Sequence, residues 1–73
     1  MSAVRYAIVI EQAAGNFSAY VPDLPGCIAA GETLKAVEAN LRAAIAFHLE
    51  GLREEGLPVP IPVSQVNYLD IAA

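Results

Sequence analysis

The sequence predicts an α+β fold with the element order β-β-β-α-β, in which one long helix packs on one face of a small sheet. Short segments rich in β-branched and aromatic residues alternate their apolar side chains, as strands do. Pro and Gly residues separate these segments. A later stretch repeats apolar residues at three- and four-residue spacing, which is typical of an amphipathic helix.

The first three strands are expected at residues 4–10, 17–21 and 27–30, joined by short turns and therefore antiparallel. Successive side chains of a strand point to opposite faces of the sheet. The face under the helix is expected to hold Tyr6, Ile8, Ile10, Phe17, Ala19 and Val21, and the uncovered face is expected to hold Arg5, Ala7, Val9, Ser18 and Tyr20.

The connection between the second and third strands reads VPDLPGC, residues 21–27. Pro22 cannot donate a ladder hydrogen bond, so the second strand ends there. Pro25 and Gly26 suit the two central positions of a type II turn, because proline presets the first φ and glycine accepts the positive φ of the second. Asp23 and Leu24 are then expected to be held out between two rigid prolines, as a contact point for a partner.

The helix is expected to start after Thr33, which is a good N-cap, and to run to about Glu55, with Gly56 as its stop. Phe47 lies on a small-residue flank, where it either forms a second contact surface or folds over the sheet edge. The apolar stripe that should face the sheet comprises Leu34, Val37, Leu41, Ile45, His48, Leu49 and Leu52.

A fourth strand is expected at residues 66–71, after a proline-rich connector. A right-handed crossover places it beside strand 1 and parallel to it, which gives the sheet order 3-2-1-4. Residues 1–73 then form a single domain, and the second face of its sheet is left for a partner.

Size and charge narrow the classes of function. A chain of 73 residues with one cysteine and one histidine has neither a disulfide nor a structural zinc site to stabilise it, so oligomerisation is expected to do so. Its net charge of −4, with four scattered Lys and Arg residues, disfavours nucleic acid and favours a basic protein partner. No apolar run is long enough to span a membrane, and a cytoplasmic location with a reduced thiol is expected.

No catalytic, metal or cofactor site is expected. A metal-dependent nuclease would need converging acids, and the candidates Glu11, Asp23, Glu38 and Asp70 are interpreted as surface or turn residues, since strand 1 has no acid at its centre. Cys27 and His48 are interpreted as packing residues, because a nucleophilic cysteine also needs an orienting group and an oxyanion hole.

Residues 6–62 resemble the N-terminal domain of the HicB-like antitoxin family. The resemblance rests on the opening strand, the block FSAYVPDLPGC, the helix start GETL and the ending HLEGLREEGLP. It implies a partial ribonuclease H-like β-β-β-α-β domain that binds and neutralises a small basic HicA-like toxin, which cleaves mRNA. The antitoxin itself performs no catalysis.

The resemblance also leaves alternatives open. Many family members carry a C-terminal DNA-binding module, which these residues do not include, so no direct DNA binding is expected. The expected assembly is a homodimer, and the competing interpretations are a self-associating module without a toxin partner or a residual nuclease. The candidate partner-binding residues are Asp23, Leu24, Tyr20, Arg5 and Phe47.

Overall fold

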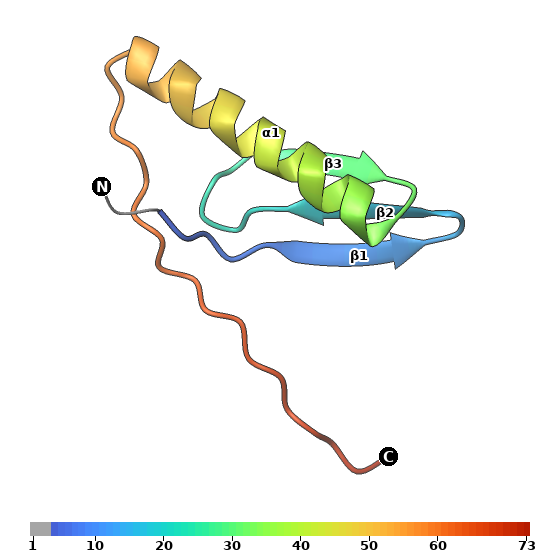
Figure 1. Ribbon diagram of the computed structural model, residues 1–73. Coiled ribbons are helices and arrows are strands. Elements are labelled where there is room, and N and C mark those ends of the chain that lie inside the picture. Colours follow the sequence, from blue (N-terminus) through green and yellow to red (C-terminus); the bar gives the residue numbers. More distant parts are fainter. Residues whose placement is uncertain (1–3) are drawn as a thin grey trace.

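The chain forms three antiparallel strands followed by one long helix, as a computed structural model of residues 4–73 shows (Figure 1). The strands β1 (Val9–Ala13), β2 (Asn16–Tyr20) and β3 (Ile28–Gly31) lie side by side in the order β1-β2-β3. The helix α1 (Leu34–Glu54) crosses one face of this sheet. The domain predicted over residues 1–73 includes residues 1–3, which lie outside the described part of the chain.

Strand β1 begins at Val9, five residues later than predicted, because the residues before it have no partner in β2. Val9 pairs with Tyr20, the last residue of β2. The next residue, Val21, donates its N–H to the Cys27 carbonyl at 3.2 Å, and Pro22 has no N–H to donate. Residues 4–8 therefore continue the line of β1 without a ladder to β2.

Both ends of α1 are fixed by local hydrogen bonds, as the sequence predicts. The hydroxyl of Thr33 accepts a hydrogen bond from the Ala36 N–H at 3.0 Å, which satisfies one of the free donors of the first turn. At the other end, Gly56 adopts φ +70° and donates to Arg53, and Leu57 donates to the Leu52 carbonyl at 2.9 Å. This pair of bonds is a Schellman motif, which ends the helix.

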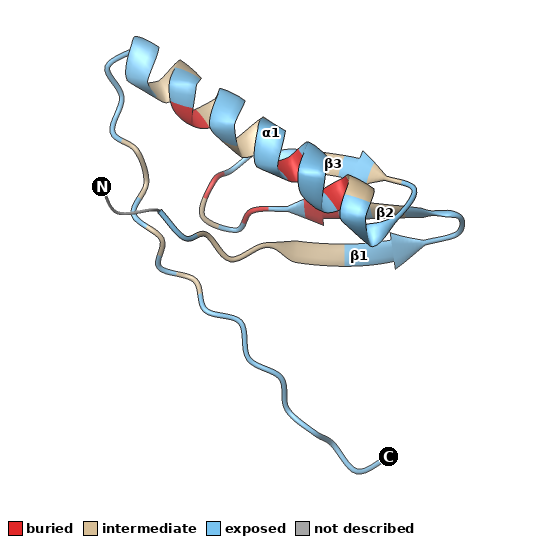
Figure 2. Ribbon diagram, in the orientation of Figure 1, coloured by how far each residue is buried: buried red, intermediate tan, exposed pale blue. Residues whose placement is uncertain are grey.

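The core lies between α1 and the strands β2 and β3, the two that the helix packs against (Figure 2). Tyr6, Ile8 and Ile10 pack against this core, so the predicted faces of the first strand are confirmed. One residue of the predicted helix stripe is misplaced: Leu34 is 52% exposed, because side chains of a helix lean toward its N-terminus and that of the first residue projects beyond it. The buried residues are Ala19, Val21, Leu24, Cys27, Val37, Leu41 and Leu49.

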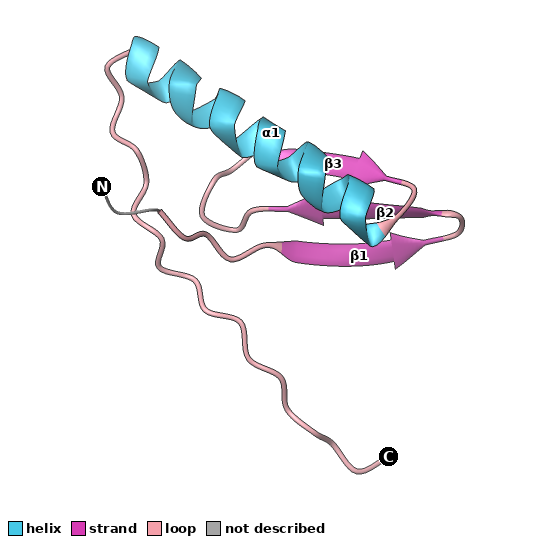
Figure 3. Cartoon of the chain, viewed as in Figure 1, coloured by secondary structure: helices cyan, strands magenta, loops and turns pink. Residues whose placement is uncertain are grey.

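The predicted fourth strand at residues 66–71 is absent from the described residues 4–73. After α1 the chain returns past residues 4–6 and then diverges from β1 without regular secondary structure (Figure 3). The β propensity of VNYLDI indicated a strand, but a strand also needs a neighbour to pair with, and these residues lie away from the sheet.

Candidate partner-binding surfaces

The 21–27 loop consists of two consecutive tight turns. Leu24 donates its N–H to the Val21 carbonyl and Cys27 donates to the Leu24 carbonyl, both at 3.1 Å. Gly26 adopts φ +82°, the value that the third position of a type II turn requires. The predicted Pro25-Gly26 turn is therefore confirmed.

Leu24 points into the protein rather than out of it. Its exposed fraction is 0%, and it belongs to the core cluster together with Val21 and Cys27. The expectation that two prolines hold this side chain out toward a partner is wrong, because the first turn folds it beneath the loop, where its burial stabilises the domain. In this conformation Leu24 is not accessible to a partner.

Asp23 is occupied by the chain's own C-terminal segment. One carboxylate oxygen accepts hydrogen bonds from the N–H groups of Val63 and Ser64, each at 3.0 Å, and the other accepts from the Ser64 hydroxyl at 2.8 Å. The backbone N–H of Ser64, followed by its hydroxyl, lowers the pKa of Asp23 below its usual 3.8, because these bonds favour the charged carboxylate. Asp23 thus anchors residues 63–64 to the 21–27 loop.

A second bond ties the same segment to the sheet. The Tyr6 hydroxyl donates to the Pro60 carbonyl at 2.6 Å, across 54 positions of sequence. Sequence reasoning missed Ser64 and the partner of Tyr6. A polar Ser-Gln pair after a run of apolar residues and prolines was a weak signal for such an anchor.

The uncovered face of the sheet carries a row of apolar side chains. Tyr20 lies opposite Val9 on one side and Ile28 on the other, and directly opposed residues share a face. Tyr20 is 40% exposed and Ile28 is 69% exposed. We call Val9, Tyr20 and Ile28 the open-face row. Glu11 pairs with Ser18 beside this row, so an exposed carboxylate flanks it.

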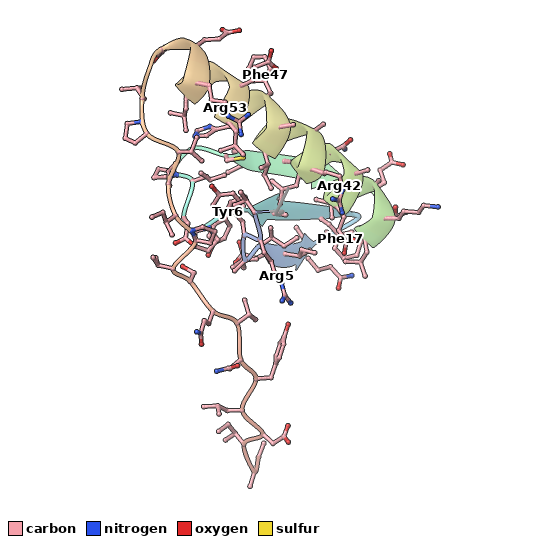
Figure 4. All side chains as sticks on the ribbon, turned by 60° about the vertical axis from the view of Figure 1, so that its left-hand side comes forward. Arg5, Tyr6, Phe17, Arg42, Phe47 and Arg53 are labelled. Carbon is pink, nitrogen blue, oxygen red and sulfur yellow. The ribbon has the colours of Figure 1, made fainter. Side chains whose placement is uncertain are left out.

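Two other predicted contact residues are also exposed, but they lie apart from each other. Arg5 projects beside β1, and Phe47 lies on the side of α1 that faces away from the sheet (Figure 4). Phe47 is 79% exposed, so its ring does not fold over the sheet edge, which was one of the two predicted alternatives. The structure therefore does not bring the five predicted residues together at one site.

The residues considered for chemistry lie apart as well. Cys27 is buried in the core, and this burial raises the pKa of its thiol. Glu11, Glu38 and Asp70 are exposed on β1, α1 and the C-terminal segment. In the described part of the chain, no three His, Cys, Asp or Glu side chains are grouped so that they could hold a metal ion. Over residues 4–73, no helix has the length and apolar character needed to cross a membrane.

Comparison with known protein families shows which family this chain belongs to. The family described as "HicB_like antitoxin of bacterial toxin-antitoxin system" matches residues 6–72, which is nearly the whole chain. The chain is a member of the HicB-like antitoxin family. The family assignment that the FSAYVPDLPGC block suggested is thus confirmed.

Curated relatives of this member of the HicB-like family include proteins of a bacteriophage, an archaeon and a cyanobacterium. An uncharacterized 14.9 kDa protein from the rep-hol intergenic region of Haemophilus phage HP1 is 44% identical over 62 residues, which are 82% of this chain and 47% of the phage protein. This chain therefore spans about half the length of that relative. The UPF0150 protein Ta0767 of Thermoplasma acidophilum is 31% identical, over 78% of this chain and 84% of its own. The UPF0150 protein ssr1765 of Synechocystis is 34% identical, over 77% and 72%.

A solved structure shares the fold of the HicB-like chain. A chain of the HicA3 and HicB3 toxin-antitoxin complex superposes with a TM-score of 0.70 and is 38% identical. The match covers 82% of this chain and 70% of that one. The related structure is thus a complex of a toxin with its antitoxin.

Proposed function

We propose that this HicB-like chain binds and neutralises a small basic HicA-like toxin and performs no catalysis of its own. The observation that carries the proposal is the likeness to a chain of the HicA3 and HicB3 toxin-antitoxin complex, at 38% identity and a TM-score of 0.70. At 38% identity the likeness extends to the sequence as well as the fold, and the family match over residues 6–72 supports the same role.

Charge supports the same partner. The chain carries eight Asp and Glu residues against four Lys and Arg residues, with a net charge of −4. A basic toxin is attracted to such a surface, and opposite net charges raise the association rate. Covering the basic surface with which the toxin holds RNA would block mRNA cleavage without any chemical step by the antitoxin.

The open-face row is the proposed contact surface. Val9, Tyr20 and Ile28 form a continuous apolar strip on a sheet face that α1 does not cover, and Glu11 flanks it. Binding hot spots are enriched in Tyr, and Tyr20 lies between two apolar side chains that can exclude water from around it. Arg5 and Phe47 remain candidate contacts at other places on the surface, whereas Asp23 and Leu24 are engaged within the chain.

A growth-rescue experiment tests the proposal. The chain is co-expressed with a short basic HicA-like protein, and rescue of growth and co-purification are measured. We expect Tyr20→Ala to weaken binding by about 30-fold, the equivalent of about 2 kcal/mol for a hot-spot residue. Phe47→Ala is the matched comparison, because it removes an exposed aromatic ring from another surface. If Phe47→Ala weakens binding and Tyr20→Ala does not, the contact surface is the outer side of α1 and not the open-face row. No complex and no rescue with the unmodified chain would refute the toxin-binding function.

We also propose a homodimer that acts in the cytoplasm, where an antitoxin must meet a toxin that cleaves mRNA. A second candidate function is self-association without a toxin, which the exposed apolar side chains of the C-terminal segment favour. A chain that dimerises but neither binds nor rescues in the growth experiment would support this second function instead.

A further inference from the structure

The sheet of this domain is incomplete along β1. Within residues 4–73, β1 has a ladder partner on one side only, and residues 4–8 have none. Strand β3 is also an edge strand, but the Asn40 side chain on α1 donates to its Ala30 carbonyl at 2.8 Å and so occupies part of that edge. Unpaired backbone groups at an edge are a template for another strand.

The helix leaves a groove beside this free edge. Because α1 packs over β3 and β2, it does not cover the line of residues 4–8, and a hollow of about 420 Å³ remains between them. We call it the β1 groove. Its apolar lining comes from Val4, Tyr6 and Ile8 on one side and from Leu41 and Ile45 on α1. Its charged lining residues are Arg5, Glu38 and Arg42.

The C-terminal tail, residues 65–73, lacks both a strand to pair with and a surface to cover its apolar side chains. Its backbone has no ladder, and its apolar side chains lie in solvent: Tyr68 is 91% exposed, Leu69 84% and Ile71 79%. The tail also extends the molecule to 48 Å by 26 Å by 22 Å, with a radius of gyration of 14.0 Å. A compact chain of this length has a radius of gyration of about 11 Å.

The direction of the tail is set where it begins. Asp23 holds the backbone of Val63 and Ser64, and prolines at positions 58, 60 and 62 stiffen the chain before them. From this anchor the tail starts beside residues 5–7, with which Ser64 to Asn67 line a common hollow, and then diverges from β1 (Figure 1). A segment that its hinge directs away from its own domain is free to pair with the same site in a second copy, which is the geometry of exchange between identical chains.

We propose that two copies of this chain exchange their tails, each tail adding a strand to the free edge of residues 4–8 in the partner. The exchange gives the backbone of residues 4–8 a ladder partner, and it removes the apolar side chains of the tail from water. It also makes the dimer isologous, since each copy is donor and acceptor. The inference rests on the proposed homodimer and not on toxin binding.

Alternation along the tail fits the two sides of this edge. In a strand formed by the tail, Leu69 and Ile71 lie on the same side. When that side faces α1, both side chains enter the β1 groove against Leu41 and Ile45. Tyr68 then falls on the uncovered face, where it extends the open-face row past Val9.

Charge and area are consistent with this seating. Asp70, the one charged side chain of the tail, falls on the uncovered face in the strand alternation and so stays out of the β1 groove, which the acidic Glu38 also lines. Burying the apolar side chains of two tails, together with the grooves that receive them, removes on the order of 1,000 Å² or more from water, which is the area of a specific interface.

Sedimentation equilibrium of the full chain alone tests whether the tail holds the dimer. We expect the unmodified chain to sediment at twice the mass of one chain, and the double substitution Leu69→Asp with Ile71→Asp to sediment as a monomer. Phe47→Asp is the control: it places one such Asp at a similarly exposed apolar position outside the edge, and its mass should stay that of a dimer. A tail variant that remains dimeric overturns the exchange and leaves the homodimer standing. A monomeric unmodified chain overturns both.

Isotope-filtered NMR of the unmodified protein distinguishes exchange from fold-back. Labelled and unlabelled full chains are unfolded together and refolded as a mixture. Exchange predicts nuclear Overhauser contacts between the Tyr68 ring of one copy and the Ala7 methyl group of the other, which share the uncovered face. The same contacts found only within one copy would show that the tail docks on its own β1, and the exchange would be wrong. Contacts of Ala7 with an added toxin, in place of contacts with Tyr68, would assign the edge to the toxin instead, and would equally overturn the exchange.

Discussion

Gly31→Ala tests the closest approach between the sheet and the helix. Gly31 ends β3 directly beneath the first turn of α1. A Cβ atom at this position would lie 2.5 Å from the Val37 backbone nitrogen and 2.9 Å from its Cα, whereas ordinary contact begins at 3.4 Å. Because these are backbone atoms, no side-chain rotation can relieve the clash, and strand or helix must move by about 0.9 Å.

The size of the effect follows from what that movement disturbs. Val37 and Leu41, two of the fully buried side chains, sit in the same turns of α1 and lose contact with the sheet when the helix shifts. Overpacking typically costs about 1–3 kcal/mol, and a clash between two backbones belongs at the upper end, about 3 kcal/mol. A chain of this length has a free energy of unfolding of roughly 4–11 kcal/mol, so the melting temperature should fall by about 12–24 °C.

Thermal unfolding followed by circular dichroism, at one fixed protein concentration, measures this effect. The matched control is Gly51→Ala, because Gly51 lies within α1 and an added Cβ meets nothing within 4 Å. Alanine is the better helix former by about 0.5–1 kcal/mol, so this control should raise the melting temperature by about 2–8 °C. If Gly31→Ala melts at or above the temperature of the unmodified chain, the helix does not rest on Gly31 as described.

The loop supplies three further predictions. Leu24→Ala should lower the free energy of unfolding, measured by urea titration, by about 2–5 kcal/mol, since the side chain is fully buried. The control Phe47→Ala removes an exposed ring and should change this free energy by less than about 0.5 kcal/mol. Equal effects of the two substitutions would contradict the burial of Leu24. Asp23→Asn should lower the melting temperature at pH 7 by weakening the anchor at Ser64. The difference in melting temperature from the unmodified chain should vanish as the pH falls below 3.8 and through the lowered pKa of the carboxylate, because the carboxylate then takes up a proton. A difference that persists in acid would contradict an ionised anchor. Cys27 should react with a thiol reagent at pH 8 only as fast as the domain opens, because burial raises the pKa of its thiol; reaction at the rate of a free thiol would contradict this.

The features that could be predicted from the sequence are those set by local physics. Thr33 and Gly56 define the ends of α1 through hydrogen bonds within four or five residues, and Gly26 defines its turn through its own φ. The side-chain alternation of residues 4–10 likewise places Tyr6 on the helix side, because a strand offers only two faces.

The features that were missed depend on residues far apart in sequence. Leu24 was placed outside because its two flanking prolines describe the turn but not what lies beneath it, which here is the core. Asp23 was considered free for a partner because nothing near it in sequence indicates that Ser64, 41 positions later, binds it. The fourth strand was predicted from propensity alone, whereas pairing requires an edge in the right place.

The anchor of the C-terminal segment also bears on the order in which the molecule assembles. The hydrogen bonds of Asp23 to Ser64 and of Tyr6 to Pro60 join residues 41 and 54 positions apart, whereas the β1–β2 hairpin closes across a two-residue turn. Longer loops cost more entropy to close, so the hairpin and helix form first and the anchor forms last. During synthesis the free edge of β1 therefore exists before any tail has left the ribosome. In the finished protein the amides of Val63 and Ser64 should be the first among the amides that are hydrogen-bonded within one chain to exchange with deuterium, through local opening that leaves the core closed.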